Sequence, residues 1–155
     1  MTAAWRRAGP GDDDAVVSAC LALNAEDPGP RPVSEAQVRC TLRALREEPW
    51  RGCAAVLEAD GAVAGYALLV SFWSNELGGE VCTIDEVFVA PAQRGRGHAT
   101  SLFELLAAGG DPLWPARPVA LTVETTPANE RARGLYRRLG FGGGNLALVR
   151  RLPPR

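Results

Sequence analysis

The chain has 155 residues and a formal net charge of −1. That length is enough to build a hydrophobic core, and we expect residues 1–155 to form a single domain. The near-neutral charge gives no electrostatic basis for binding nucleic acid or a membrane surface. No apolar run approaches the roughly 20 residues that a membrane helix needs, and the N-terminal sequence lacks the apolar segment of a signal peptide, so we expect a cytoplasmic protein.

The residue types also exclude several kinds of enzyme. The four cysteines form no C-x-x-C pair and His98 is the single histidine, so no zinc or other metal site is expected. A Ser-His-Asp or Cys-His hydrolase would need His98 as its base, yet this residue lies in a glycine-rich turn. All 17 basic residues are arginine, which excludes Schiff-base chemistry on a lysine.

The first third of the sequence predicts an edge strand and two helices. The strand is expected at Ala4–Arg7, and Asp12–Asp14 then begin a helix with acidic residues suited to its N-terminus. Asn24–Val33 contains three prolines and a glycine, which predicts a loop. Ser34 begins the second helix, and Gln37 three residues later completes a capping-box pattern.

A β-hairpin is predicted next. Cys53–Leu57 and Ala62–Trp73 have strand character and are joined at Asp60-Gly61, a strong two-residue turn signal. Ser74–Glu80 is expected to be the following turn.

The central stretch combines a strand, a turn and a helix. Val81–Val89 is apolar and β-branched like a buried strand, yet it contains two adjacent carboxylates, Asp85 and Glu86. Ala99–Ala108 has the apolar spacing of a helix, and the basic, glycine-rich turn Arg94–Gly97 lies between them. The first turn of a helix has backbone N–H groups without internal partners, so this arrangement can hold an anion. We therefore expect a site for a phosphorylated cofactor beside a carboxylate.

The last third predicts a strand, a helix and a final strand. Val119–Glu124 is a near-continuous apolar run, typical of a strand covered on both faces. A helix is expected over Asn129–Leu139, and Leu146–Arg151 can pair as a last strand. The order β-α-α-β-β-β-α-β-α-β predicts a mixed α/β fold.

Two motifs lie on these elements. The first is Arg94-x-x-Gly97-x-Ala99, and the second, about thirty residues later, is N-x-x-A-x-x-L-Y beginning at Asn129 and followed by Gly140-Phe141. Together they resemble the GNAT superfamily of N-acetyltransferases, over essentially the whole chain. The resemblance implies a central mixed, mostly antiparallel sheet flanked by helices, with the cofactor at the strand–turn–helix unit.

The resemblance also implies acetyl-CoA as the cosubstrate. The Arg94–Thr100 turn would wrap the pyrophosphate, the Val87–Val89 strand would pair with the pantetheine amides, and Asn129 would lie near the pantetheine arm. His98 stands where the family usually has an aliphatic residue. The expected cofactor-binding residues are Val87, Phe88, Val89, Arg94, Gly95, Arg96, Gly97, His98, Ala99, Thr100, Asn129 and Ala132.

Acetyl transfer to an amine requires a base, because an alkyl amine is mostly protonated at pH 7. Glu86 adjoins the cofactor-pairing segment and is the first choice. Asp85 aligns with an acidic substrate contact in the spermidine/spermine branch of the family and remains an alternative. Tyr136 matches the tyrosine that protonates the departing sulfur in this family. The same side chains also fit plain structural roles, the carboxylates paired with arginines and the tyrosine packed in the core.

The expected function is an N-acetyltransferase that acts by direct transfer in a ternary complex. The acceptor would be a primary amine on a small molecule or a peptide, and a homodimer is expected. In this family two regions line the acceptor side, here Glu26-Asp27 and Trp73 with Glu76, which gives an acidic rim suited to a cationic amine. The alternative is a non-catalytic acyl-CoA-binding sensor with the same fold.

Overall fold

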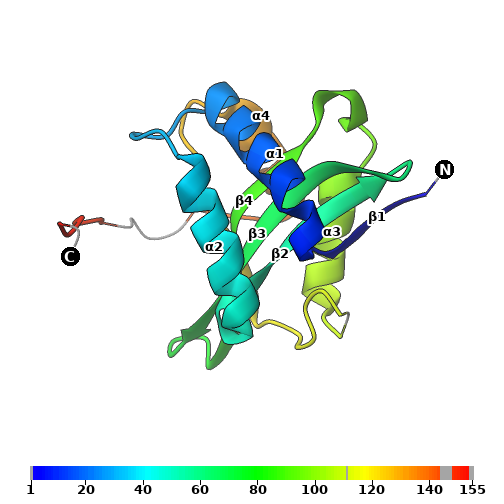
Figure 1. The fold of residues 1–155 in the computed structure, drawn as a ribbon. Helices are drawn as coiled ribbons and strands as arrows, with labels where there is room; N and C mark the ends of the chain where they lie inside the picture. Colours follow the sequence, from blue (N-terminus) through cyan, green and yellow to red (C-terminus); the bar gives the residue numbers. More distant parts are fainter. Residues whose placement is uncertain (1, 111, 144–147, 154–155) are drawn as a thin grey trace.

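The computed structural model describes residues 2–110, 112–143 and 148–153. Within them, five strands form one sheet in the order β1-β2-β3-β4-β5 (Figure 1). Neighbouring strands are antiparallel except β4 and β5, which run parallel. The strands are β1 (Ala3–Arg7), β2 (Gly52–Ala59), β3 (Ala62–Ser74), β4 (Gly79–Val89) and β5 (Ala120–Val123). The helices are α1 (Asp13–Glu26), α2 (Glu35–Glu47), α3 (His98–Ala108) and α4 (Glu130–Arg138), with short 3₁₀ turns at Pro10–Asp12, Pro49–Arg51 and Pro91–Gln93.

Helices cover both faces of the sheet. Helices α1 and α2 lie on one face and α3 on the other (Figure 1). Apolar side chains alternate along β3, so Tyr66 packs in the cluster with α1 and α2, whereas Leu69 packs in the cluster with α3. This is the mixed, mostly antiparallel arrangement that the resemblance to the GNAT superfamily implies. No helix in the described ranges has the length and apolar character needed to cross a membrane.

Local sequence signals are confirmed where they are strong. The Ser34 hydroxyl accepts a hydrogen bond from the Gln37 backbone, and the Gln37 side chain accepts one from the Ser34 backbone, which is the predicted capping box. Asp60 and Gly61 have φ values of 54° and 78°, as a tight hairpin turn with two left-handed residues requires.

Three predictions of local structure differ from the structure. Helix α1 continues to Glu26 because the N–H of Asp27 still bonds the carbonyl of Leu23, and the first proline comes only afterwards. Strand β5 is half-buried rather than covered on both faces, since it ends the described sheet. The predicted last strand falls partly outside the described residues, and its described part, 148–151, is not in a strand.

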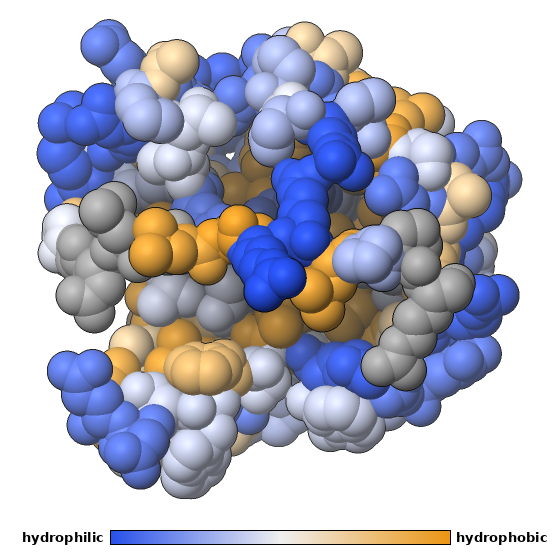
Figure 2. Space-filling view, turned by 90° about the vertical axis from the view of Figure 1, so that its left-hand side faces the viewer, coloured by the Kyte–Doolittle hydropathy of each residue, from blue (hydrophilic) through white to orange (hydrophobic). Residues whose placement is uncertain are grey.

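Strand β4 has two halves with different neighbours. It pairs with β3 along its whole length, but β5 pairs only with its first half, Val81–Ile84. The register with β3 also shifts: Leu69 faces Ile84, whereas Leu68 faces Glu86, so Asp85 is the extra residue of a β-bulge. In the described residues no strand covers the second half of β4 on the β5 side, and this leaves an open edge. One face of the molecule is hollowed, with apolar side chains at its floor and hydrophilic ones around and across it (Figure 2).

Candidate functional site

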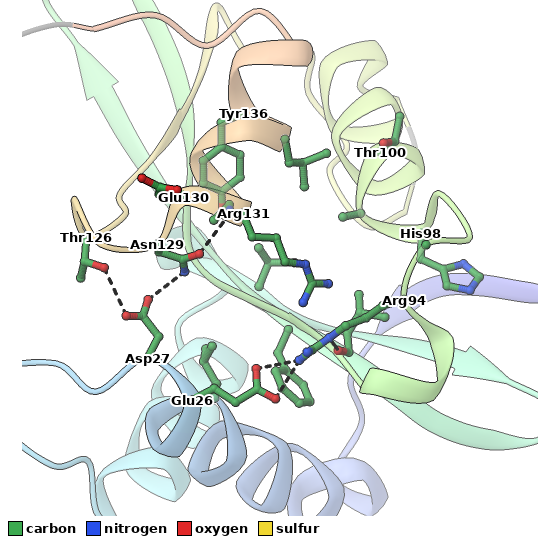
Figure 3. A pocket seen from close by; sticks show the side chains of 18 of the residues that line it. Glu26, Asp27, Arg94, His98, Thr100, Thr126, Asn129, Glu130, Arg131 and Tyr136 are labelled. Carbon is green, nitrogen blue, oxygen red and sulfur yellow. Dashed lines mark hydrogen bonds and ion pairs between the residues drawn. The ribbon is translucent and has the colours of Figure 1, made fainter.

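A cavity of about 1010 Å³ lies where four segments meet. Its walls come from the end of α1, the end of β4, the turn that leads into α3, and the segment that contains α4 (Figure 3). This volume suits a ligand of cofactor size. Fourteen of the sequence-predicted site residues line it: Glu26, Asp27, Val87, Phe88, Val89, Arg94, Gly95, Gly97, His98, Ala99, Thr100, Asn129, Ala132 and Tyr136.

The open edge of β4 presents backbone groups to this cavity. The N–H of Ala90 donates to the carbonyl of Ala64 on the β3 side. Because backbone groups alternate along an antiparallel ladder, those of Val87 and Val89 are turned away from β3. The carbonyl of Val89 is used on that side by a hydrogen bond from the Arg94 side chain at 2.7 Å. Both groups of Val87 and the N–H of Val89 therefore face the open edge.

The turn into α3 adds further backbone donors. Gly97 is the N-cap of α3 with φ 79°, and no side chain caps the helix there. Ser101 makes the first helical bond, to Gly97, so the N–H groups of residues 98–100 have no helical partners. A Cβ placed on Gly95 or Gly97 would have no atom within 4 Å, so the space in front of the turn is open. These donors form a site with partial positive charge beside the open strand edge.

Arg94 joins three parts of the cavity wall. Its guanidinium donates to the Val89 carbonyl and to both carboxylate oxygens of Glu26, at 2.9 and 2.7 Å. It also lies over the Phe88 ring, 5.4 Å from the centroid. The turn, β4 and the end of α1 are therefore held together by one side chain. Arg96, also predicted to bind the cofactor, is exposed and is not part of the cavity lining.

Asp27 and Asn129 connect the end of α1 to the start of α4. Asn129 donates to Asp27 at 3.0 Å and accepts from the backbone N–H of Ala132 at 3.1 Å, which caps α4 (Figure 3). Asp27 also accepts from the Thr126 hydroxyl at 3.2 Å. Both polar atoms of the Asn129 side chain therefore have a protein partner. This bridge spans 102 residues of sequence and has no local signal that could have predicted it.

Tyr136 reaches the cavity from α4. Its ring packs edge-on against Phe103 and Phe141, with centroids 5.8 Å from each. Burial raises the pKa of the Tyr136 phenol, and the negative charge of Asp27 raises it further. The phenol therefore stays protonated at neutral pH and can act as a proton donor.

The two strand carboxylates lie in different surroundings, and neither is part of the cavity lining. Glu86 faces α1, where it accepts hydrogen bonds from the Tyr66 hydroxyl at 2.8 Å and from the Cys20 thiol at 3.5 Å. Asp85, the extra residue of the bulge, is exposed to solvent. Its pKa is nevertheless raised, mainly by desolvation from neighbouring atoms and next by repulsion from the charges of Glu86 and Glu124. The bulge interrupts the strict side-chain alternation of a regular strand at this pair. It places Glu86 on the α1 face, whereas Ile84 packs toward α3.

The remaining predicted residues, Trp73 and Glu76, do not belong to the cavity lining. Trp73 and Glu76 are exposed near the tip of the β3–β4 hairpin, with Trp73 at 70% exposure. In the part of the chain that the structure describes, no group of three or more His, Cys, Asp or Glu side chains could hold a metal ion. Arg131 and Arg138 also line the cavity, from α4, and no motif in the sequence indicates them.

Comparisons with known proteins identify the family and the fold. The chain is 35% identical to the mycothiol acetyltransferase of Nocardia farcinica over 141 residues, which cover 88% of this chain and 43% of that protein. It therefore spans less than half the length of this curated relative.

Solved structures share the fold. A possible acetyltransferase from Clostridium difficile 630 matches with a TM-score of 0.80 at 18% identity, covering 100% of both chains. An aminoglycoside N-acetyltransferase in complex with CoA matches with a TM-score of 0.73 at 16% identity, covering 97% of this chain and 95% of that one. Residues 18–141 match the family described as the acetyltransferase (GNAT) family. The chain therefore belongs to the GNAT family of acetyltransferases.

Proposed function

We propose that this protein transfers the acetyl group of acetyl-CoA to a primary amine, by direct attack in a ternary complex. The observation that supports this best is the open edge of β4 next to the uncapped N-terminus of α3. An extended ligand with amide groups can pair with such an edge as an added strand. A phosphate group at one end of that ligand would then reach the N–H groups of the α3 turn.

The residues present fit acetyl-CoA on two counts. Val87 offers a free N–H and carbonyl, and Val89 a free N–H, which matches a pantetheine arm with its two amides. Gly95 and Gly97 leave the approach to the backbone open, because a side chain at either position would occupy that space. Bound acetyl-CoA supplies a thioester carbonyl that an amine can attack.

The chain's own groups would then move two protons. A carboxylate, Glu86 as first choice or Asp85, would take the proton of the acceptor ammonium directly or through water. As the carbon–sulfur bond breaks, Tyr136 would give its proton to the departing sulfur, whose thiol has a pKa of about 8.5. The second proton, which the attacking nitrogen loses on becoming an amide, would restore the Tyr136 phenol. A backbone N–H of β4 that the pantetheine arm leaves free would stabilise the oxyanion that forms when the nitrogen–carbon bond is made.

The acceptor is proposed only as a class, an amine on a small molecule or a peptide. Glu26 and Asp27 of the acidic rim already have partners. Glu26 is bonded to Arg94, and Asp27 is bonded to Asn129 and Thr126. A cationic acceptor would compete with these bonds. The curated relative is named for mycothiol and one structural neighbour for aminoglycosides, so both kinds of acceptor belong among the amines to test.

One observation favours a second candidate, an acyl-CoA-binding sensor without turnover. Neither Glu86 nor Asp85 lines the cavity, so the proposed base is not in contact with the cofactor site. A sensor would need the strand edge and the turn but no base.

The test compares binding with turnover. Calorimetry would measure acetyl-CoA affinity, and a thiol assay would follow CoA release with an aminoglycoside, a polyamine and a peptide with a free N-terminus. We expect turnover with at least one amine, and a Tyr136→Phe variant should lose about 100-fold or more in kcat with little change in affinity, because its ring contacts remain. Binding without turnover on any amine would favour the sensor. Absence of binding would refute both candidates.

A further inference from the structure

Two of the three arginines that line the cavity, Arg94 and Arg131, are in opposite electrostatic situations. Arg94 is bonded to a backbone carbonyl and to both oxygens of Glu26, so its charge is already neutralised. Its side chain is 21% exposed, and a pyrophosphate could use this guanidinium only by displacing Glu26. The arginine that the sequence motif highlights is thus held as part of the wall.

Arg131 is the contrasting case. It comes from the first turn of α4, lines the same cavity, and points into it from the side opposite Arg94 (Figure 3). Within the described residues no hydrogen bond or ion pair involves its guanidinium. An unpaired guanidinium directed into a cavity is the arrangement that an incoming anion can use.

The other cation that lines the cavity from α4 lies differently. A Cβ built on Gly134 would be 3.6 Å from Nη1 of Arg138, so the Arg138 side chain runs back along its own helix. Arg131 alone of these three arginines is both directed into the cavity and free of a protein partner among the described residues.

We propose that Arg131 is the cationic ligand of the cofactor pyrophosphate and that Arg94 is a positioning residue that holds the turn against β4 and α1. This inference rests on the proposed acetyl-CoA site. The pyrophosphate has two negative charges. It would lie between the N–H groups of residues 98–100 on one side and the Arg131 guanidinium on the other. The two arginines therefore affect binding in different ways, one by charge and one by geometry.

The experiment measures affinity for CoA and for dephospho-CoA, which lacks the 3′-phosphate, in wild type and in Arg131→Gln. We expect Arg131→Gln to weaken both ligands about tenfold or more, as the loss of a charge-assisted hydrogen bond does. The loss should shrink in 1 M NaCl, where exposed charges are screened within about 3 Å. A loss with CoA but not with dephospho-CoA would assign Arg131 to the 3′-phosphate and overturn the proposal.

Two controls separate charge from position. Arg137 is exposed like Arg131 but lies outside the cavity lining, so Arg137→Gln removes the same charge from α4 and affinity should not change. Arg94→Gln should weaken CoA and the phosphate-free ligand pantetheine by similar factors, whereas Arg131→Gln should leave pantetheine binding unchanged.

Several outcomes would contradict the inference. Equal effects of Arg131→Gln and Arg137→Gln on affinity would show that Arg131 has no specific role. A loss of affinity in Arg94→Gln that is confined to phosphate-bearing ligands would show that Arg94, not Arg131, is the cationic ligand of the pyrophosphate. If wild type binds CoA and Arg131→Gln binds it equally well, this inference fails while the proposed function stands. If wild type binds no CoA, both fail.

Discussion

Asn129 offers the most direct test of how α4 is held over the cavity. This helix has nine residues, none of them buried, and a glycine at position 134. Helices shorter than about 12 residues are marginal in water, so α4 depends on its cap and on tertiary contacts. Asn129 supplies both: it caps the helix by accepting a hydrogen bond from the Ala132 N–H, and it makes a tertiary contact by donating one to Asp27.

The expected cost of Asn129→Ala follows from these two bonds. Loss of an N-cap costs about 1 kcal/mol, and loss of a partly buried hydrogen bond costs about 1 kcal/mol more. A sum of about 2 kcal/mol corresponds to a roughly 30-fold rise in local opening of α4. Because α4 has no buried residue, this opening should be local and should leave the sheet protected.

Amide hydrogen exchange measures this directly, by comparing α4 with α3 in the same sample. Asn129→Asp should keep an oxygen for the Ala132 N–H but lose the bond to Asp27 and place two carboxylates together, so its effect separates the bridge from the cap. Gly134→Ala should recover about 1 kcal/mol, since the added Cβ would be at ordinary contact distance from Arg138. Asn75→Ala, in the exposed β3–β4 turn, is the matched control.

Two results would refute this reasoning. Unchanged exchange in α4 of Asn129→Ala would mean that the cap and the bridge contribute nothing. An equal rise in α3 and α4 would mean that the two helices open together, and that α4 is not a separate unit.

Two further predictions concern pH and charge. Burial raises the pKa of Cys53 from 9.0 to about 11 and that of Cys82 to about 12, so the folded protein keeps thiol protons that the unfolded chain releases. The free energy of unfolding should therefore fall as pH rises from 9 toward 11, by up to about 1.4 kcal/mol per pH unit for each thiol. In urea titrations between pH 9 and 10, a Cys53→Ala, Cys82→Ala double variant should lose stability less steeply with pH than wild type. The raised pKa of Asp85 means that its charge is disfavoured in the fold, so its cost appears as pH rises above 3.8, and Asp85→Asn should be as stable as wild type or more so at pH 7 in the same titration. A loss of stability in Asp85→Asn would instead show that a cation holds this carboxylate.

Sequence reasoning succeeded where the cause of a structure is local. The capping box at Ser34, the turn at Asp60-Gly61 and the glycine at the start of α3 each depend on a few adjacent residues, and all three are confirmed. The bulge at Asp85 was not predictable, because it results from the register between β3 and β4. The partners of Arg94 and Asn129 were equally hidden, since Glu26 and Asp27 lie 68 and 102 residues away.

Those distant pairs also explain an unfavourable feature of α1. The helix ends in Glu26 followed by Asp27, with no basic residue in its last turn. Acidic residues at a helix C-terminus are repelled by the helix dipole, typically by about 0.3–1 kcal/mol each. The structure gives each of them a compensating partner in a different part of the cavity wall, Arg94 for Glu26 and Asn129 for Asp27. The end of α1 thus joins the turn before α3 to the start of α4, and the spacing of the two walls around the proposed cofactor depends on two consecutive carboxylates.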